Sequence, residues 1–165
     1  MARLLLDAML GRLATYLRMC GYDAAYALDE GVEEADAVLS LARREGRTLV
    51  TRNQSLADRY PETVLLCSRE LTEQLTELSE AGFSLGLPET PERCSICNGT
   101  LTRVSPDEPT PEYAPSTAEF DVWRCEDCGQ QFWRGSHWEE MRETLEAVGA
   151  CDGPEDGSDQ NPNAD

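Results

Sequence analysis

Two pairs of closely spaced cysteines limit the folding of this chain more than any other feature. Cys94 and Cys97 form one pair and Cys125 and Cys128 form the second, in the pattern C-x2-C-x27-C-x2-C. Four thiolates suit a tetrahedral Zn²⁺ with Zn–S bonds of about 2.3 Å, and they leave no open position for a substrate. We therefore predict a structural Zn²⁺ in a small module that uses the metal to fold. A redox role for the two pairs is the alternative.

Short apolar segments alternate with amphipathic segments through the first half of the chain. The expected strands cover residues 3–6, 22–28, 47–51 and 63–67. The expected helices lie between Asp7 and Gly21 and at 35–45, 54–60 and 68–81. Strands that alternate with helices are typical of βαβ units with right-handed crossovers. The pattern thus predicts an α/β fold with a mainly parallel sheet.

Three side chains with oxygen ligands follow three of these strands. Asp7 ends the first strand, Asp36 opens the helix after the second, and Asn53 follows the third. The carboxyl ends of parallel strands share one edge, where open α/β sheets place ligands. Two carboxylates and an amide suit Mg²⁺ or Mn²⁺, which activates water and stabilises phosphoryl transfer. The alternatives are local: the acids satisfy helix N-termini, and Asn53 is a turn residue.

The chain is strongly acidic and contains no Lys. Its 165 residues carry 32 acidic and 14 basic side chains, which gives a formal net charge of −18. An acidic tail explains only part of this charge. We interpret the composition as that of a halophilic protein, because molar salt shortens the Debye length to about 3 Å. Such acidity argues against duplex binding in ordinary buffer, but it leaves open a nucleic-acid enzyme with an Arg-lined or metal-loaded site.

Hydropathy and cysteine spacing indicate the compartment and the division of the chain. No apolar stretch reaches the length of a membrane span, and the first apolar run is too short for a signal peptide, so we expect neither. The odd total of 7 Cys, with two C-x2-C pairs, indicates metal binding in the cytoplasm rather than a disulfide framework. We expect a domain at 1–83, a linker at 84–92, a zinc ribbon plus helix at 93–149, and a disordered acidic tail at 150–165.

Aromatic side chains and the only His gather around the second cysteine pair. The aromatic residues are Phe120, Trp123, Phe132, Trp133 and Trp138. They are able to stack nucleobases, but such residues more often pack a small core around zinc, and we favour that interpretation. His137 lies at the start of the last expected helix, 136–149. It is a candidate for phosphate or substrate contact, although its position alone favours a structural His by about two to one.

Several segments of the chain resemble the Mut-seven C-terminal RNase domain family. They are LLLDAMLGRLATYLRMCGYDAAY, DAVLSLARREGRTLVTRN, RCSICNGTL and WRCEDCGQQFWRGSHWEEM, and the likeness covers roughly residues 2–145. The resemblance implies a PIN-like three-layer α/β domain with a mainly parallel sheet, followed by a small zinc ribbon and a C-terminal helix. It also implies ribonuclease activity through acids that hold a divalent metal.

Carried over by position, Asp7 and Asp36 match the first two acids of the family. The third acid usually follows a Thr-Arg pair, but in this chain that position holds Asn53. An amide oxygen can bind a metal ion but brings no negative charge. Asp58 is a nearby candidate to take the place of the missing acid.

Arg12 and Arg52 are our candidates for contact with RNA phosphates, although Arg12 is equally well explained as a solvated helix residue. We expect a cytoplasmic, metal-dependent endoribonuclease that hydrolyses RNA phosphodiester bonds. The alternative is a catalytically weakened RNA- or protein-binding module, which Asn53 favours. A toxin-like nuclease held by a partner protein is less favoured, because the ribbon adds a stable module with no need for such control.

Overall fold

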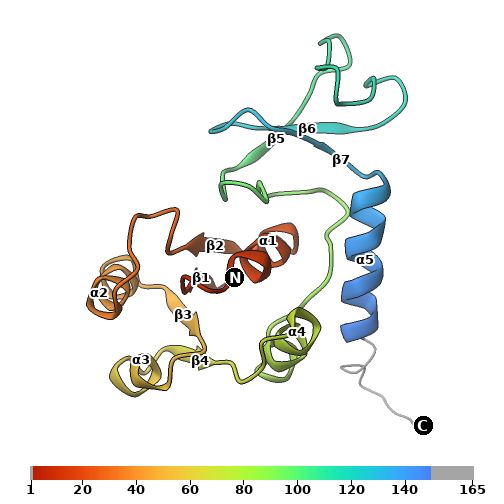
Figure 1. Ribbon diagram of the computed structural model, residues 1–165. Coiled ribbons are helices and arrows are strands. Elements are labelled where there is room, and N and C mark those ends of the chain that lie inside the picture. Colours follow the sequence, from red (N-terminus) through yellow and green to blue (C-terminus); the bar gives the residue numbers. More distant parts are fainter. Residues whose placement is uncertain (1, 150–165) are drawn as a thin grey trace, which may run out of the picture.

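The computed structural model describes residues 2–149, and the tail predicted to be disordered lies outside the described residues. A four-stranded parallel sheet, in the order β2-β1-β3-β4, precedes a three-stranded antiparallel sheet (Figure 1). The strands of the parallel sheet are β1 (Arg3–Leu6), β2 (Asp23–Tyr26), β3 (Thr48–Thr51) and β4 (Thr63–Leu65). The accompanying helices are α1 (Gly11–Met19), α2 (Ala35–Glu45), α3 (Gln54–Arg59) and α4 (Leu71–Glu80). The predicted α/β fold is confirmed.

The central strand β1 places alternate side chains into two separate cores. Leu5 packs with Leu39 of α2 and Leu56 of α3, whereas Leu4 and Leu6 pack on the opposite face with α1 and α4. Figure 1 shows α2 and α3 on one side of the sheet and α1 and α4 on the other. A parallel strand covered on both faces has a continuous apolar sequence, and the three leucines of β1 have this form.

The last helix, α5 (Ser136–Gly149), returns to the core of the parallel sheet. Leu145 and Val148 are buried in the same cluster as Leu4 and Leu6, and α5 lies beside α4 (Figure 1). Phe83, Leu85 and Leu87, from the end of α4 and the expected linker, pack against this cluster as well. The helix that we grouped with the ribbon therefore shares its buried face with the first domain.

The antiparallel sheet forms the ribbon and has its own small core. Its strands, in the order β5-β6-β7, are β5 (Leu101–Arg103), β6 (Val122–Cys125) and β7 (Gln131–Trp133). Trp123 is buried with Cys94 and Cys125, and Phe132 packs partly against them. Phe120 is exposed, so the aromatic residues divide between core and surface.

The element ends differ in detail from the sequence prediction. The helix expected from Ser68 begins at Leu71 as α4. The Ser68 hydroxyl instead accepts a hydrogen bond from the Glu70 N–H and donates to Glu73, which makes a local turn before the helix. Within residues 2–149, no helix is long and apolar enough to cross a membrane.

Candidate active site and metal centre

Asp7 lies at the carboxyl edge of the parallel sheet and is almost fully buried, with 5% exposure. Its backbone N–H donates to the Val50 carbonyl at 3.0 Å, which continues the pairing of β1 with β3. The Oδ1 atom accepts from the Ala8 N–H at 2.7 Å, and Oδ2 accepts from the Thr51 hydroxyl at 2.6 Å. Each carboxylate oxygen has a further lone pair, so these bonds fix the side chain without exhausting its ability to bind a ligand.

Thr51 joins Asp7 to the third predicted site residue. Its hydroxyl oxygen, which donates to Asp7, also accepts from the Asn53 N–H at 3.0 Å. The side chain of Asn53 turns away to cap α3, because its Oδ1 accepts from the Ser55 N–H at 2.9 Å. The structure thus brings Asp7 and Asn53 to one edge, and it gives the Asn53 amide the local turn role that we had weighed against metal binding.

Asp36 lies in the first turn of α2, and its side chain is 85% exposed. Its Oδ1 accepts from the Arg59 guanidinium at 2.5 Å, and this partner holds the pKa of Asp36 below its usual value. In the described part of the chain, no hydrogen bond or ion pair joins Asp36 to Asp7 or Asn53. Asp58, the substitute that we considered, is exposed and accepts from Gln54 at 2.9 Å.

The two predicted phosphate-binding arginines lack carboxylate partners within residues 2–149. Arg12 is exposed in the first turn of α1, and Arg52 directly follows β3. The Nε atom of Arg52 is buried and has no hydrogen-bond partner. Most other arginines of this acidic chain are paired with Asp or Glu. We call the carboxyl edge of the sheet around Asp7 and Asn53 the acid edge. The guanidinium groups of Arg12 and Arg52, which lie next to this edge in the fold, are therefore still available to an anionic ligand.

The four predicted zinc ligands converge in the ribbon. The Sγ atoms of Cys94, Cys97, Cys125 and Cys128 all lie within 4.8 Å of one another. Cys94 and Cys128 are 3.6 Å apart, and Cys97 and Cys125 are 3.4 Å apart. Tetrahedral Zn–S bonds of about 2.3 Å require sulfur atoms at roughly this separation. The cluster fits a zinc ribbon and can hold a zinc ion, with no position left for a substrate.

The turn at each C-x2-C pair is a zinc knuckle. In each knuckle, two backbone N–H groups donate hydrogen bonds to the Sγ atom of the first cysteine of the pair. The N–H groups of Asp127 and Cys128 donate to Cys125 Sγ at 3.3 and 3.4 Å. Burial opposes ionisation of Cys125, but hydrogen bonds from these N–H groups and from the thiols of Cys97 and Cys128 outweigh it and lower the pKa of the Cys125 thiol to about 7. Cys94 is more deeply buried, and its desolvation raises the pKa of its thiol to about 12. A bound cation would offset that cost, because thiolate is the form that binds metal.

The first zinc knuckle is attached to the parallel sheet by polar contacts that the sequence analysis missed. Asn98 follows the knuckle in the left-handed conformation, with φ of 73°. Its Oδ1 accepts from the Ala24 N–H at 3.0 Å, and its Nδ2 donates to Asp23 at 2.7 Å. Because β2 is the edge strand, Asn98 satisfies an N–H group that would otherwise lack a partner. An Asn immediately after C-x2-C is the available sequence signal, since Asn tolerates φ > 0.

A second connection runs through Arg18, which joins α1 to this knuckle. Only 4% of the residue is exposed, and its Nε donates to the Ala24 carbonyl at 2.8 Å. Its Nη1 donates to the carbonyl oxygens of Ser95 and Ile96 at 3.2 and 3.1 Å. One buried guanidinium therefore binds β2 and the zinc knuckle at the same time, and it also pairs with Asp29 at 3.5 Å.

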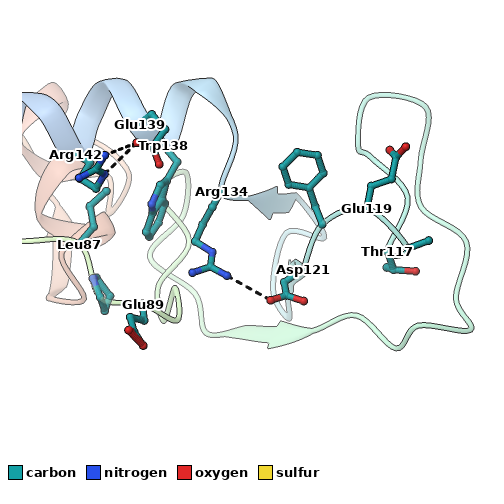
Figure 2. A pocket seen from close by; sticks show the side chains of 12 residues that line it. Leu87, Glu89, Thr117, Glu119, Asp121, Arg134, Trp138, Glu139 and Arg142 are labelled. Carbon is teal, nitrogen blue, oxygen red and sulfur yellow. Dashed lines mark hydrogen bonds and ion pairs between the residues drawn. The ribbon is translucent and has the colours of Figure 1, made fainter.

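Two cavities reach the first turn of α5, and neither includes Asp7 or the sheet edge around it. The larger, of about 590 Å³, lies between α5, the segment at 87–89 and the loop at 117–121. Figure 2 shows its walls crossed by ion pairs of Arg134 with Asp121 and of Arg142 with Glu139. The smaller, of about 380 Å³, is lined by His137. His137 is exposed in the first turn of α5, and its side chain makes no hydrogen bond within the described residues.

The chain thus combines a three-layer parallel α/β domain, with a buried aspartate at its sheet edge, and a four-cysteine ribbon attached to the edge strand β2. The model of the Mut7-C RNAse domain matches residues 2–145, and the chain belongs to this family. The resemblance found in the sequence is thereby confirmed. No curated protein and no solved structure matches the chain.

Proposed function

We propose that the protein is a cytoplasmic, metal-dependent endoribonuclease that hydrolyses RNA phosphodiester bonds at the edge formed by Asp7, Asp36 and Asn53. The observation that carries the proposal is the buried Asp7 carboxylate, fixed by Thr51 and Ala8 at the carboxyl end of β1. The two donors offset the cost of burying this carboxylate and hold it at the edge where open α/β sheets place ligands. Family membership supports RNA as the substrate.

The residues at the edge fit a divalent cation of the Mg²⁺ or Mn²⁺ type. Such an ion is commonly held by one or two carboxylates together with water and substrate phosphate. Asp7 supplies one fixed carboxylate, and Asp36 would supply a second after leaving Arg59. When bound, the cation supplies a Lewis acid that lowers the pKa of water and stabilises phosphoryl charge.

The arginines beside Asp7 would bind and orient the RNA backbone. Arg52 has a buried Nε without a partner, and a phosphate oxygen would satisfy it. Arg12 follows Asp7 in the chain at the start of α1, where the positive end of the helix dipole also favours an anion. In hydrolysis a water oxygen adds to phosphorus, the P–O bond to one ribose breaks, and that ribose oxygen leaves with a proton.

The test is cleavage of a labelled RNA in high-salt buffer with Mg²⁺, Mn²⁺ or EDTA. We expect metal-dependent cleavage by the wild type and a loss on the order of 100-fold in Asp7→Asn. Asn has the same shape and keeps one acceptor oxygen, so it retains the hydrogen bond from Thr51 but not the separate bond from the Ala8 N–H, and we expect it to fold. The matched control is Asp107→Asn, which changes an exposed acid in the loop between β5 and β6 and should cleave RNA normally.

A second candidate function is a catalytically weakened RNA- or protein-binding module. The capping bond of Asn53 and the ion pair of Asp36 with Arg59 favour it, because both side chains are engaged elsewhere. Asn53→Asp separates the two candidates, since Asp caps α3 equally well and adds negative charge at the edge. Cleavage by Asn53→Asp but not by the wild type would establish the weakened module. Faster cleavage by Asn53→Asp than by an active wild type would support the nuclease.

A further inference from the structure

The smaller cavity has the form of a binding site that the proposed nuclease edge does not use. It lies between the C-terminal end of α1, the first zinc knuckle, β7 and the start of α5. Its apolar wall includes Met19, Ile96, Phe132, Trp133 and Trp138. Its volume of about 380 Å³ falls within the range of cavities that hold small organic groups, about 300–1,000 Å³.

The charge of this cavity differs from that of the rest of the molecule. None of its lining residues is Asp or Glu, although the chain carries 32 acidic residues. The larger cavity, by contrast, is lined by four acidic side chains. Arg93 lines the smaller cavity, which opens at the N-terminus of α5. The first backbone hydrogen bond of this helix joins the Glu139 N–H to the Gly135 carbonyl. The N–H groups before Glu139 and the helix dipole favour a negative group there.

Gln131 is the observation that points to a ligand. It lines the cavity from β7, is 8% exposed, and its Oε1 atom is buried without a hydrogen-bond partner. A buried acceptor without a donor costs free energy, which a ligand carrying an N–H group would recover. Trp133 is held beside it, because a Cβ atom on Gly135 would lie 2.7 Å from the indole Nε1. The turn thus fits closely around a flat aromatic surface.

We propose that this cavity binds one unpaired nucleobase of RNA, which stacks on Trp133 and donates an N–H hydrogen bond to Gln131 Oε1, with an adjacent phosphate at the N-terminus of α5. The choice of RNA rests on the proposed function. Stacking on aromatic side chains is how proteins bind single strands without reading a duplex. A base in a duplex has its face covered and its N–H donors paired, so the cavity selects single-stranded RNA.

The position of the cavity sets a length requirement. Asp7 precedes α1, and Met19 ends it, so the acid edge and the cavity lie at opposite ends of this helix. A helix of 9 residues spans about 13 Å. An RNA that occupies both sites must therefore extend over several nucleotides, and an octamer is a suitable probe.

The test measures binding apart from cleavage. A fluorescein-labelled adenosine RNA octamer is titrated into zinc-loaded protein without Mg²⁺ or Mn²⁺, in the Asp7→Asn background, and anisotropy gives the Kd. We expect Gln131→Leu to bind roughly tenfold more weakly. Thr102→Val, an exposed change on β5 outside the cavity, should bind normally. An RNA duplex of eight base pairs should bind roughly tenfold more weakly than the single strand.

A second measurement needs no variant of the cavity. Two of the three tryptophans line it, so a stacked base should quench their fluorescence in otherwise unaltered protein. Unchanged tryptophan emission, or unchanged Kd in a Gln131→Leu variant that still binds zinc, would overturn the base pocket. Cleavage that is lost in Asp7→Asn while Gln131→Leu binds normally leaves the nuclease standing without this pocket. Quenching and Gln131-dependent binding by a protein that never cleaves RNA support the pocket and overturn the nuclease.

Discussion

At the scale of single residues, Thr51 organises the acid edge. It is fully buried, and its hydroxyl group both donates to Asp7 and accepts from the Asn53 backbone. Sequence analysis placed the acid correctly at the end of a strand but read Thr51 only as part of a Thr-Arg pair. A hydroxyl that joins two strand ends is invisible to periodicity, because its partner lies 44 positions away.

The substitution Thr51→Val tests this organising role. Val has nearly the same shape but lacks the hydroxyl, so both bonds are lost and the buried Asp7 loses a partner. We expect the free energy of unfolding to fall by about 1–3 kcal/mol in urea titrations and RNA cleavage to slow. Thr48→Val on the same strand is the control, because Thr48 makes no side-chain hydrogen bond within the described residues. Equal behaviour of the two variants would contradict the role of Thr51.

Asp23 takes part in the attachment of the ribbon to β2, because it accepts a hydrogen bond from Asn98. Partial burial disfavours its charged form, but hydrogen bonds from Arg47 and Asn98 outweigh burial and lower its pKa. A lowered pKa in the folded state stabilises the protein above the pKa of the unfolded chain, about 3.9. This contribution is lost as the pH falls through the folded-state pKa.

We therefore predict that Asp23→Asn lowers the free energy of unfolding by about 2 kcal/mol at neutral pH. The difference from the wild type should shrink as the pH falls below about 4, because the wild-type carboxylate becomes protonated. Both proteins are compared at each pH, and their zinc content is measured at the same time. A difference that stays constant down to pH 3 would contradict the prediction.

At the scale of elements, the apolar patterns located the strands and helices well. The helix expected at 35–45 is α2 with those bounds, and β1 was placed at 3–6. The ends were less accurate where side chains compete with the backbone, as Ser68 does before α4. The destination of α5 had no local signal. An apolar stripe shows that a helix face is buried but not which core covers it.

Zinc removal should affect the ribbon and leave the parallel sheet folded. All three tryptophans lie between residues 123 and 138, in the ribbon and the start of α5, whereas α1 to α4 precede residue 81. We expect a chelator to shift tryptophan emission to longer wavelength, while far-UV circular dichroism keeps most of its helical signal. The ribbon core is small, so its folding relies on the metal. Re-addition of Zn²⁺ should restore the emission, and no change on chelation would contradict a structural zinc.

At the scale of the whole molecule, the composition predicts stabilisation by salt. A net charge of −18 on 165 residues produces self-repulsion that molar salt screens. We expect Tm to rise by about 5 °C or more between low and molar NaCl. Sodium sulfate at equal ionic strength is the control, because screening alone gives the same Tm in both salts. A Tm that does not rise with NaCl would contradict the halophilic interpretation.

The packing of α5 on β1 also determines when the molecule is complete during its synthesis. The leucines of β1 leave the ribosome early, whereas Leu145 and Val148, which complete their core, leave much later. At roughly 5–20 residues per second, the delay is on the order of ten seconds or more. In that interval a partial chain exposes leucines that attract chaperones and proteases. A chain broken off before α5 would therefore be removed as unfinished rather than persist as a free parallel-sheet domain.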